Sequence, residues 1–295
     1  MKNEIKVGFC VAYDWYYLAQ ALPLVYAEAD RICLSLDAAR CSWAGQPFGF
    51  DEAGFRALVQ QLDVAGKVDV YEDDFHRPEL TPMQNENRQR QLMAQRLGAG
   101  GWHVQLDADE YFLNFAGFAA WLRGLRPGRP VNIRCPYITL FKEVDGGYLV
   151  VEQPDYFKLD GNPVATNEPA YQHGRVSGWF NVHAPFFIVH QSWARSADEI
   201  EQKIGNWGHK NDFDTQAYFQ FWNNLSKLNY QQADGFHPII PQLWDKMSLV
   251  PAHSVPELIQ HYQQKPPAIP SALQLALKNS IWLARATSLF SRFLK

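Results

Sequence analysis

Residues 5–112 alternate short apolar runs with segments of helical spacing, and this alternation restricts the fold more than any other feature of the chain. The apolar runs, which predict buried strands, lie at 5–13, 31–38, 67–75 and 102–112. The helical segments between them lie at 15–29, 50–66 and 82–100. Strands that alternate with helices in this way indicate an α/β fold, with a mostly parallel sheet flanked by helices.

The remainder of the chain predicts fewer regular elements. A β-rich segment at 131–153 is followed by a loop-rich stretch at 155–190 and by helical segments at 196–208 and 215–228. We therefore expect one folded domain over residues 1–262. Residues 263–295 begin with the proline-rich stretch "QQKPPAIP", which predicts a linker, and they end in a separate helical extension.

Composition excludes several classes of protein. The formal net charge is −4 and the sequence pI is about 6.1, so no general polyanion-binding surface is implied and nucleic acid is not an expected partner. The four cysteines contain no CxxC pair, which favours reduced thiols. No run approaches the roughly 20 apolar residues that span a bilayer. The start of the chain also lacks a signal-like apolar stretch, so we expect a cytoplasmic protein.

Two aspartates follow predicted strands. Asp37 ends the second apolar run and Asp107 ends the fourth. In open α/β sheets, ligands bind beyond the carboxyl ends of the strands. The order of elements therefore predicts that Asp37 and Asp107 face one crevice.

The stretch "LDADEYF" contains a DxD pair, Asp107 and Asp109. If the strand continues through Asp109, a period of two places both carboxylates on one face at the crevice. Two hard oxygen ligands suit Mg²⁺ or Mn²⁺. The alternatives are a solvated acidic strand end or a helix-capping aspartate. A second DxD, Asp212 and Asp214, lies between two predicted helices. The DxD spacing alone therefore does not indicate a metal site.

The order of elements and "LDADEYF" together resemble GT-A glycosyltransferases, of the bacterial family 2 type and with similarity to family 92 relatives. The segments "VHQSWARSADEIEQKIGNWGH" and "LSLDAARCSWAGQPF" are also similar to patterns of those relatives. The resemblance covers about Lys6 to His209. It departs from the family after the first strand, where many relatives carry an Asn-Glu pair and this chain has Asp14.

The resemblance implies a metal-dependent, inverting enzyme with Mn²⁺ or Mg²⁺ as cofactor. It would move a sugar from a nucleotide-diphosphate donor, a UDP-sugar by expectation, to a hydroxyl of a glycan or lipid-linked acceptor, as in lipopolysaccharide or other polysaccharide synthesis. Two other functions use the same features. One is a nucleotidyltransferase acting on sugar phosphates, and the other is a non-catalytic carbohydrate-binding module, which the 14% of aromatic residues would suit.

The resemblance also assigns residues at the metal and the donor. It implies that Asp107 faces the donor ribose and the metal, that Asp109 coordinates the metal, and that His190 is a third ligand. It further implies that Asp37 contacts the nucleotide. The alternatives are a core histidine at position 190 and a turn-forming aspartate at position 37. Glu110 would support the metal ligands or would be solvated.

The helical segment "QNENRQRQLMAQRL" places Asn87, Arg90 and Gln91 on one face, with Arg88 beside them. The resemblance puts one or two of these side chains near the donor, and we take Asn87 and Arg88 as donor-binding candidates. The alternative is a solvated helix face.

Lys203 and His209 are implied to reach the donor diphosphate. The alternative for Lys203 is a surface ion pair with Glu199, four residues before it. The spacing of Ser196 and Glu199 is that of a capping box, so Glu199 is assigned to the helix start.

The general base is expected in the loop-rich stretch before His190. Glu168 in "ATNEPAY" is our candidate for the catalytic base, and Asp155 and Asp160 are competitors that the sequence does not separate from it.

The C-terminal segment predicts an amphipathic helix. Ser271 is a good N-cap, and Lys278, Arg285 and Arg292 recur every seven residues beside an apolar arc. A basic edge on an apolar face suits an anionic membrane surface, so peripheral contact with the inner membrane is one expectation. Docking of the same face on its own domain or on a second copy is the other.

Overall fold

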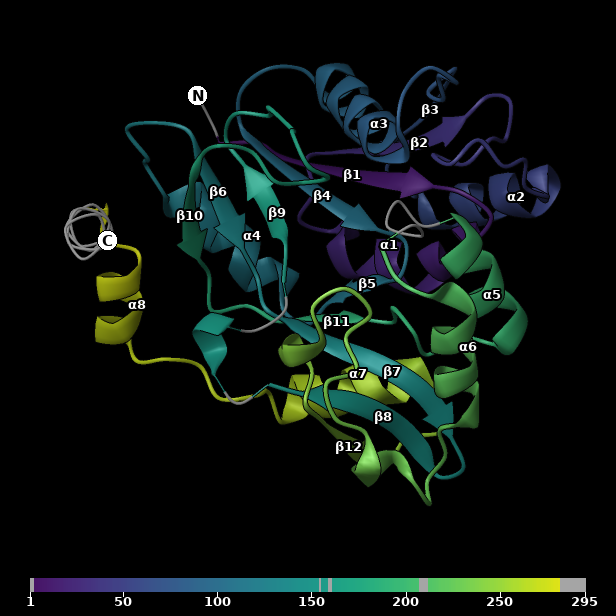
Figure 1. Cartoon of the computed structure of the whole chain (residues 1–295). Helices are drawn as coiled ribbons and strands as arrows, with labels where there is room; N and C mark the ends of the chain where they lie inside the picture. Colours follow the sequence, from purple (N-terminus) through teal and green to yellow (C-terminus); the bar gives the residue numbers. More distant parts are fainter. Residues whose placement is uncertain (1–2, 154, 159–160, 207–211, 282–295) are drawn as a thin grey trace, which may run out of the picture.

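The computed structural model describes residues 3–153, 155–158, 161–206 and 212–281. Two sheets and their helices make up the body of the molecule (Figure 1). The strands are β1 Ile5–Val11, β2 Arg31–Asp37, β3 Val68–Asp73, β4 Trp102–Asp107, β5 Glu110–Phe112, β6 Val131–Arg134, β7 Tyr137–Val144, β8 Gly147–Glu152, β9 Pro163–Thr166, β10 Phe180–His183, β11 Ile188–His190 and β12 Lys246–Val250. The helices are α1 Leu18–Tyr26, α2 Glu52–Leu62, α3 Pro82–Leu97, α4 Phe115–Gly124, α5 Ala197–Asn206, α6 Thr215–Asn224, α7 Val255–Gln264 and α8 Ala272–Lys278.

The first sheet has the order β10-β6-β9-β4-β1-β2-β3. Strand β1 pairs in parallel with both β2 and β4, and β2 pairs in parallel with β3. Strand β9 is antiparallel to both of its neighbours, so the sheet is mixed but mostly parallel. The predicted α/β class and the strand–helix order of residues 5–112 are confirmed.

The first sheet buries both faces, as the apolar runs predict. Val7 and Phe9 of β1 point to the main core, where Leu18 of α1 also lies. The intervening positions face α3: a side-chain carbon added at Gly8 would lie 2.8 Å from the sulfur of Met93. Gly8 therefore allows α3 to approach β1 closely, and α3 covers one face while α1 covers the other.

Helix α3 is fixed at both ends. Thr81 and Gln84 form a capping box and Pro82 is the first helical residue. At the other end, Gly98 takes a φ of +82°. The ammonium group of Lys6, 2% exposed, donates to the carbonyls of residues 98–100 at 2.6 to 2.8 Å. This contact anchors the end of α3 to β1.

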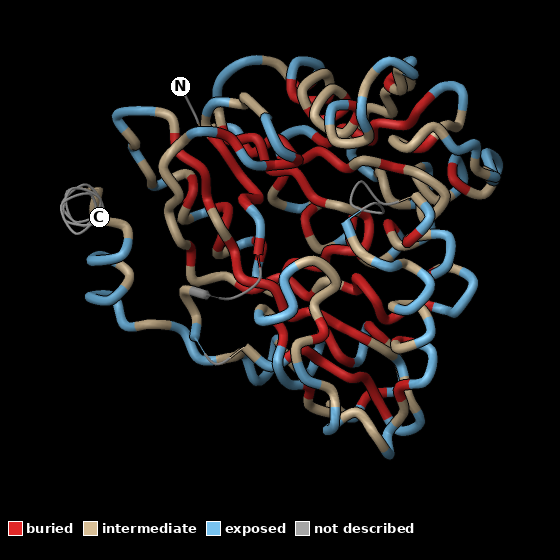
Figure 2. Tube along the Cα trace, viewed as in Figure 1, coloured by how far each residue is buried: buried red, intermediate tan, exposed pale blue. Residues whose placement is uncertain are grey.

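The second sheet has the order β12-β8-β7-β11-β5 and extends the core below the first (Figure 2). On one face, Phe141 of β7 packs with Trp193, Trp222 and Trp244. On the other face, Leu140 joins the main core. Many of the aromatic residues are thus buried in the structural core, which weakens the reading of the aromatic excess as a sugar-binding platform.

The acidic stretch departs from the expected continuous strand. Strand β4 ends at Asp107, Ala108 and Asp109 form a turn, and Glu110 begins β5, which pairs with β11 of the second sheet. The two aspartates therefore do not alternate along one strand. The chain passes from one sheet to the other at the DxD pair, and this places both side chains at the junction of the two sheets.

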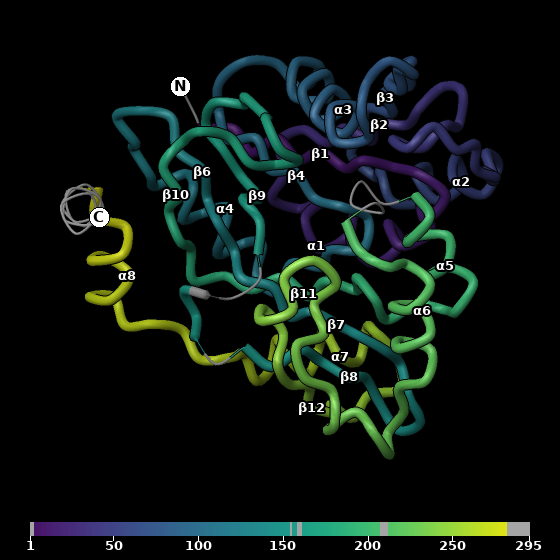
Figure 3. The backbone as a smooth tube through the Cα atoms, in the orientation of Figure 1, coloured from purple at the N-terminus to yellow at the C-terminus, as the bar shows by residue number. Residues whose placement is uncertain are grey.

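The C-terminal part leaves the body after α7, which buries Leu258 and Ile259. Helix α8 lies beside β10 (Figure 3), where the Asn279 amide pairs with the backbone of His183 through two hydrogen bonds of 2.8 and 2.9 Å. Arg285 and Arg292 of the predicted basic stripe lie outside the described residues. No helix in the described part of the chain is both long and apolar enough to cross a membrane.

Candidate active site

A cleft of about 650 Å³ opens at the carboxyl ends of β1 and β4. The chain runs from β1 to β2 and β3 on one side, then returns through α3 to β4 on the other side of β1. This reversal of strand order is where open α/β sheets bind ligands. Asp37, Asp107 and Asp109 all line the cleft, so the prediction that Asp37 and Asp107 face one crevice is confirmed.

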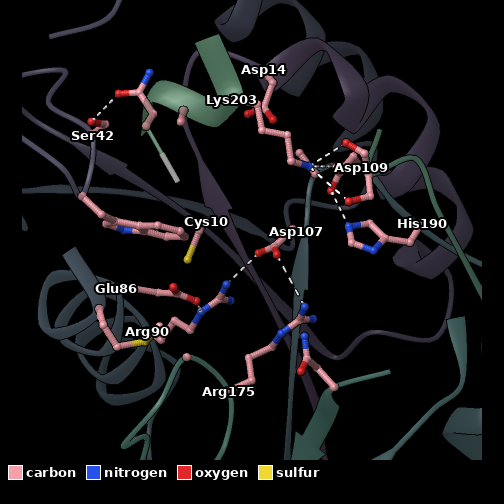
Figure 4. Close-up of a pocket in the computed structure, with 18 of the residues that line it drawn as sticks. Cys10, Asp14, Ser42, Glu86, Arg90, Asp107, Asp109, Arg175, His190 and Lys203 are labelled. Carbon is pink, nitrogen blue, oxygen red and sulfur yellow. Dashed lines mark hydrogen bonds and ion pairs between the residues drawn. The ribbon is translucent and has the colours of Figure 1, made fainter. Parts of the chain in front are cut away.

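Asp107 lies between two buried arginines (Figure 4). Nη2 of Arg90 is 2.8 Å from Oδ1 of Asp107, and Nη2 of Arg175 is 3.5 Å from Oδ2. Burial opposes ionisation, but the two guanidinium groups outweigh it and lower the pKa of Asp107 to about 2. Asp107 is therefore an anion at any physiological pH.

Asp109 is surrounded by a second set of cations. Nη2 of Arg195 donates to its Oδ2 at 2.5 Å, and Nζ of Lys203 lies 3.7 Å from the same oxygen. Arg195 also contacts Asp14 at 3.0 Å, so one guanidinium group bridges two carboxylates. Burial opposes ionisation of Asp109, but Arg195, Lys203 and His190 hold the pKa of that carboxyl well below its usual range.

Glu110 is completely buried and forms the base of the acidic cluster. Arg175 donates to both of its carboxylate oxygens at 2.6 and 2.7 Å, and the Tyr137 hydroxyl donates to Oε1 at 2.7 Å. The backbone N–H of Asp107 donates to Oε2 at 3.2 Å. Glu110 is therefore not solvated. It ties the end of β4 to Arg175 by charge-assisted bonds.

Asp109 and His190 are spaced to share the divalent cation that the resemblance implies. Oδ1 of Asp109 and Nε2 of His190 lie 3.7 Å apart, and two ligand bonds of about 2.1 Å each can span that separation. Within the described residues, no group of three or more acidic, histidine or cysteine side chains could hold a metal. Two protein ligands still suit Mg²⁺ or Mn²⁺, which often take further oxygens from substrate phosphates.

His190 lies at the end of β11 with 18% of its side chain exposed, and it lines the cleft. Its Nδ1 atom is buried and has no hydrogen-bond partner among the described residues. It is not enclosed as a core histidine would be. Its assignment as a metal ligand stays a prediction.

Lys203 lies inside the cleft and not on the surface beside Glu199. Its ammonium group donates to the Ser192 carbonyl at 2.7 Å. Burial, followed by the nearby Arg195, lowers the pKa of Lys203 to about 8. Glu199 receives the backbone N–H of Ser196 at 2.9 Å, so its assignment to the helix start is confirmed. His209 lies outside the described residues.

Asp37 lines the cleft, where its carboxylate holds a loop, and its contact with the nucleotide stays a prediction. Its Oδ1 accepts from the N–H groups of Ala39 and Cys41, and its Oδ2 accepts from those of Phe75 and His76, all at 3.0 Å. Four backbone donors leave the carboxylate little capacity for a nucleotide base. Asp37 therefore fixes the loop after β2 against the loop after β3.

Three other predicted site residues lie outside the cleft lining. Asn87 bonds to the backbone at 172–174, Arg88 contacts the Asp74 carbonyl at 3.4 Å, and neither lines the cleft. Glu168 lies beyond β9 and is also absent from the cleft lining, and its assignment as the base stays a prediction. Asp155 does not line the cleft either, and Asp160 lies outside the described residues.

Sequence reasoning missed several cleft residues. Arg175 and Arg195 carry the charge that balances the acidic cluster, and Glu86 is a further carboxylate that lines the cleft. Asp14 also lines it, and the sequence marks Asp14 only as a departure from the family pattern. The segment "HQSWARSADE" contains Arg195, but its pattern does not indicate that Arg195 pairs with Asp109. Arg175 stands in a loop-rich stretch with no periodic signal.

Comparison of the chain with protein-family models and with curated proteins gives no match. Solved structures with similar folds include 4-diphosphocytidyl-2C-methyl-D-erythritol synthase from Anaerococcus prevotii, with a TM-score of 0.36, 13% identity, and coverage of 57% of this chain and 71% of that one. HddC from Yersinia pseudotuberculosis has a TM-score of 0.35 and 10% identity, and the match covers 63% of this chain and 92% of that one.

A third similar structure, mannose-1-phosphate geranyltransferase from Thermus thermophilus, gives a TM-score of 0.24 with 10% identity, and coverage of 84% of this chain and 74% of that one. Scores this low support no inference about activity. The resemblance to GT-A glycosyltransferases that the sequence shows stays a prediction.

Proposed function

We propose that the chain is a transferase that binds a nucleoside-diphosphate sugar in the β1–β4 cleft and moves the sugar to an acceptor hydroxyl. The observation that carries this proposal is the geometry at the end of β4. Asp109 lies against Arg195, Lys203 and His190 at the switch point of a mostly parallel sheet. The cleft volume of about 650 Å³ suits a nucleotide-sized ligand.

Two cations would receive the leaving diphosphate, namely the Lys203 ammonium group and a bound divalent ion. Lys203 is the cation with the more exposed side chain, at 17% against 2% for Arg195. A compact ammonium group at that position can follow the phosphate as negative charge develops. A divalent cation held by Asp109 and His190, with Asp107 near, would add Lewis-acid stabilisation of the same charge.

The acceptor proton needs a carboxylate in the cleft. Asp14 and Glu86 fill this requirement better than Glu168, because both line the cleft. Burial raises the pKa of Asp14 even though Arg195 lies beside it, and a raised pKa suits a general base. Asp14 is therefore our candidate base.

Donor binding can be tested by calorimetry of the full chain with UDP and with GDP, each with and without Mn²⁺. We expect one nucleotide to bind in a Mn²⁺-dependent manner, and we expect Lys203→Ala to weaken that binding at least about ten-fold, or 1.4 kcal/mol. Lys265→Ala, at an exposed lysine beyond α7, is the matched control. If neither nucleotide binds to the wild-type chain, the proposal is wrong.

Nucleotidyl transfer to a sugar phosphate is the second candidate, and one observation favours it. Four cationic side chains line the cleft, namely Arg90, Arg175, Arg195 and Lys203, and a nucleoside triphosphate carries more charge than a diphosphate. Against it, the loop after β1 offers Ala12–Asp14, with neither glycine nor a basic residue. The products separate the two: glycosyl transfer releases a nucleoside diphosphate, and nucleotidyl transfer releases pyrophosphate.

Peripheral membrane contact belongs to the same proposal, because a lipid-linked acceptor would require it. In α8, Leu273 and Leu277 are 69% and 50% exposed, and Lys278 stands near them. We expect the full chain, and not a chain ending at Ile269, to float with anionic liposomes. If the full chain does not float with anionic liposomes, the proposal of peripheral membrane contact is wrong.

A further inference from the structure

Residues 172–176, called the Arg175 hairpin below, form a tight turn at the rim of the cleft. The N–H of Val176 donates to the His173 carbonyl at 3.0 Å, and the N–H of Gln172 donates to the Val176 carbonyl at 2.9 Å. Gly174 takes a φ of +60°, a conformation that L side chains rarely adopt. The turn therefore depends on Gly174, and it delivers the next residue, Arg175, into the protein.

Asn87 fastens this hairpin to α3. Its Nδ2 donates to the Gln172 carbonyl at 2.8 Å, and its Oδ1 accepts the N–H of Gly174 at 2.7 Å. One amide thus uses a donor and an acceptor on a segment that lies 85 and 87 residues further along the chain. Because both polar ends of the side chain are occupied, Asn87 is oriented toward the hairpin and not toward the cleft.

The other end of the hairpin reaches the acidic cluster. The Arg175 side chain is 4% exposed and donates to Glu110, to the Gln105 carbonyl at 3.0 Å and to the Tyr137 hydroxyl at 2.9 Å. Its Nη2 also lies 3.5 Å from Asp107. A surface turn therefore supplies the counter-charge for two carboxylates at the end of β4.

We infer that Asn87 is a positioning residue for the proposed donor site, because it holds the Arg175 hairpin on α3 and thereby keeps Arg175 against Glu110 and Asp107. The inference rests on the proposed function for its ligand, but the mechanical link from Asn87 to the end of β4 can be tested without any ligand. Through this link, Asn87 would influence the donor site from outside the cleft, although the resemblance places it near the donor.

Hydrogen exchange of the full chain tests the mechanical link. In Asn87→Ala, exchange should rise at least about ten-fold in peptides that cover 172–176, and it should also rise in those that cover 105–111. Asn87→Asp keeps the acceptor for the Gly174 N–H and should show a smaller rise. Gly174→Ala keeps the Asn87 side chain but strains the turn and places a methyl group 3.1 Å from Oε1 of Glu86, and it should reproduce the effect of Asn87→Ala. Gln95→Ala, at an exposed position of the same helix, should leave exchange unchanged.

The same variants are then titrated with UDP and with GDP in the presence of Mn²⁺. We expect Asn87→Ala and Gly174→Ala to weaken nucleotide binding about ten-fold, with Asn87→Asp between them and the wild type. If binding weakens in Asn87→Ala while exchange at 172–176 is unchanged, Asn87 contacts the donor itself and the inference is wrong. It is also wrong if exchange rises at 172–176 but not at 105–111. If the wild-type chain binds no nucleotide, the proposed function fails, and the exchange data still decide the link.

Discussion

Replacement of Asp109 with asparagine is expected to abolish Mn²⁺-dependent donor binding and to lower turnover at least about a thousand-fold. Asp109 is the carboxylate that faces His190, Arg195 and Lys203 together. Asparagine keeps the shape but removes the charge that a divalent cation needs and that fixes the two basic side chains. A loss of about 4 kcal/mol of transition-state stabilisation corresponds to this factor. Calorimetry and initial rates with the donor sugar measure it.

The second DxD of the chain supplies the matched control. Asp214 caps α6 by accepting the N–H groups of residues 216 and 217, and asparagine is an equally good N-cap. Asp214→Asn should therefore retain wild-type donor binding and turnover. Near-normal turnover in Asp109→Asn would show that the cleft does not use Asp109, and the metal assignment would have to be abandoned.

Replacement of Arg175 with methionine should lower the free energy of unfolding by about 3–5 kcal/mol. Arg175 and Glu110 form a pair that is almost fully buried, and removing one partner leaves the other charge without compensation. Urea denaturation of the full chain, followed by tryptophan fluorescence, measures the change. Donor binding should fall as well, because Asp107 also loses a neighbouring cation.

A double variant separates charge from packing. Arg175→Met combined with Glu110→Gln removes both charges, so much of the lost stability should return. Arg96→Ala removes an arginine from an exposed ion pair with Asp69 and should change stability little. If Arg175→Met is as stable as the wild type, the buried pair does not support the end of β4 as described.

The first sheet could be predicted because its signals are local. Each apolar run of residues 5–112 is bounded by a helical segment, and parallel strands buried on both faces read as continuous apolar sequence. The cleft followed from the same reasoning, since carboxyl ends of parallel strands meet at one edge. The turn at Ala108 and Asp109 could not be predicted in this way, because it depends on the pairing of Glu110 in β5 with His190 in β11, 80 residues later.

The site residues could likewise be predicted only where the signal is local in the sequence. Asp109, His190 and Lys203 are in the cleft, as their motifs predict. Asp37 and Asn87 were assigned to the donor, but backbone groups from distant loops occupy their side chains. Arg175 meets Glu110 across 65 residues of sequence, and no local pattern marks such a contact. Side-chain contacts that depend on where distant loops lie could therefore not be predicted from the sequence.

Anomalous diffraction from crystals grown with MnCl₂ and UDP tests the central claim most directly. We expect a manganese peak at about 2.1 Å from both Oδ1 of Asp109 and Nε2 of His190, with the diphosphate beside Lys203. Manganese bound away from Asp109, or a nucleotide bound outside the β1–β4 cleft, would contradict it.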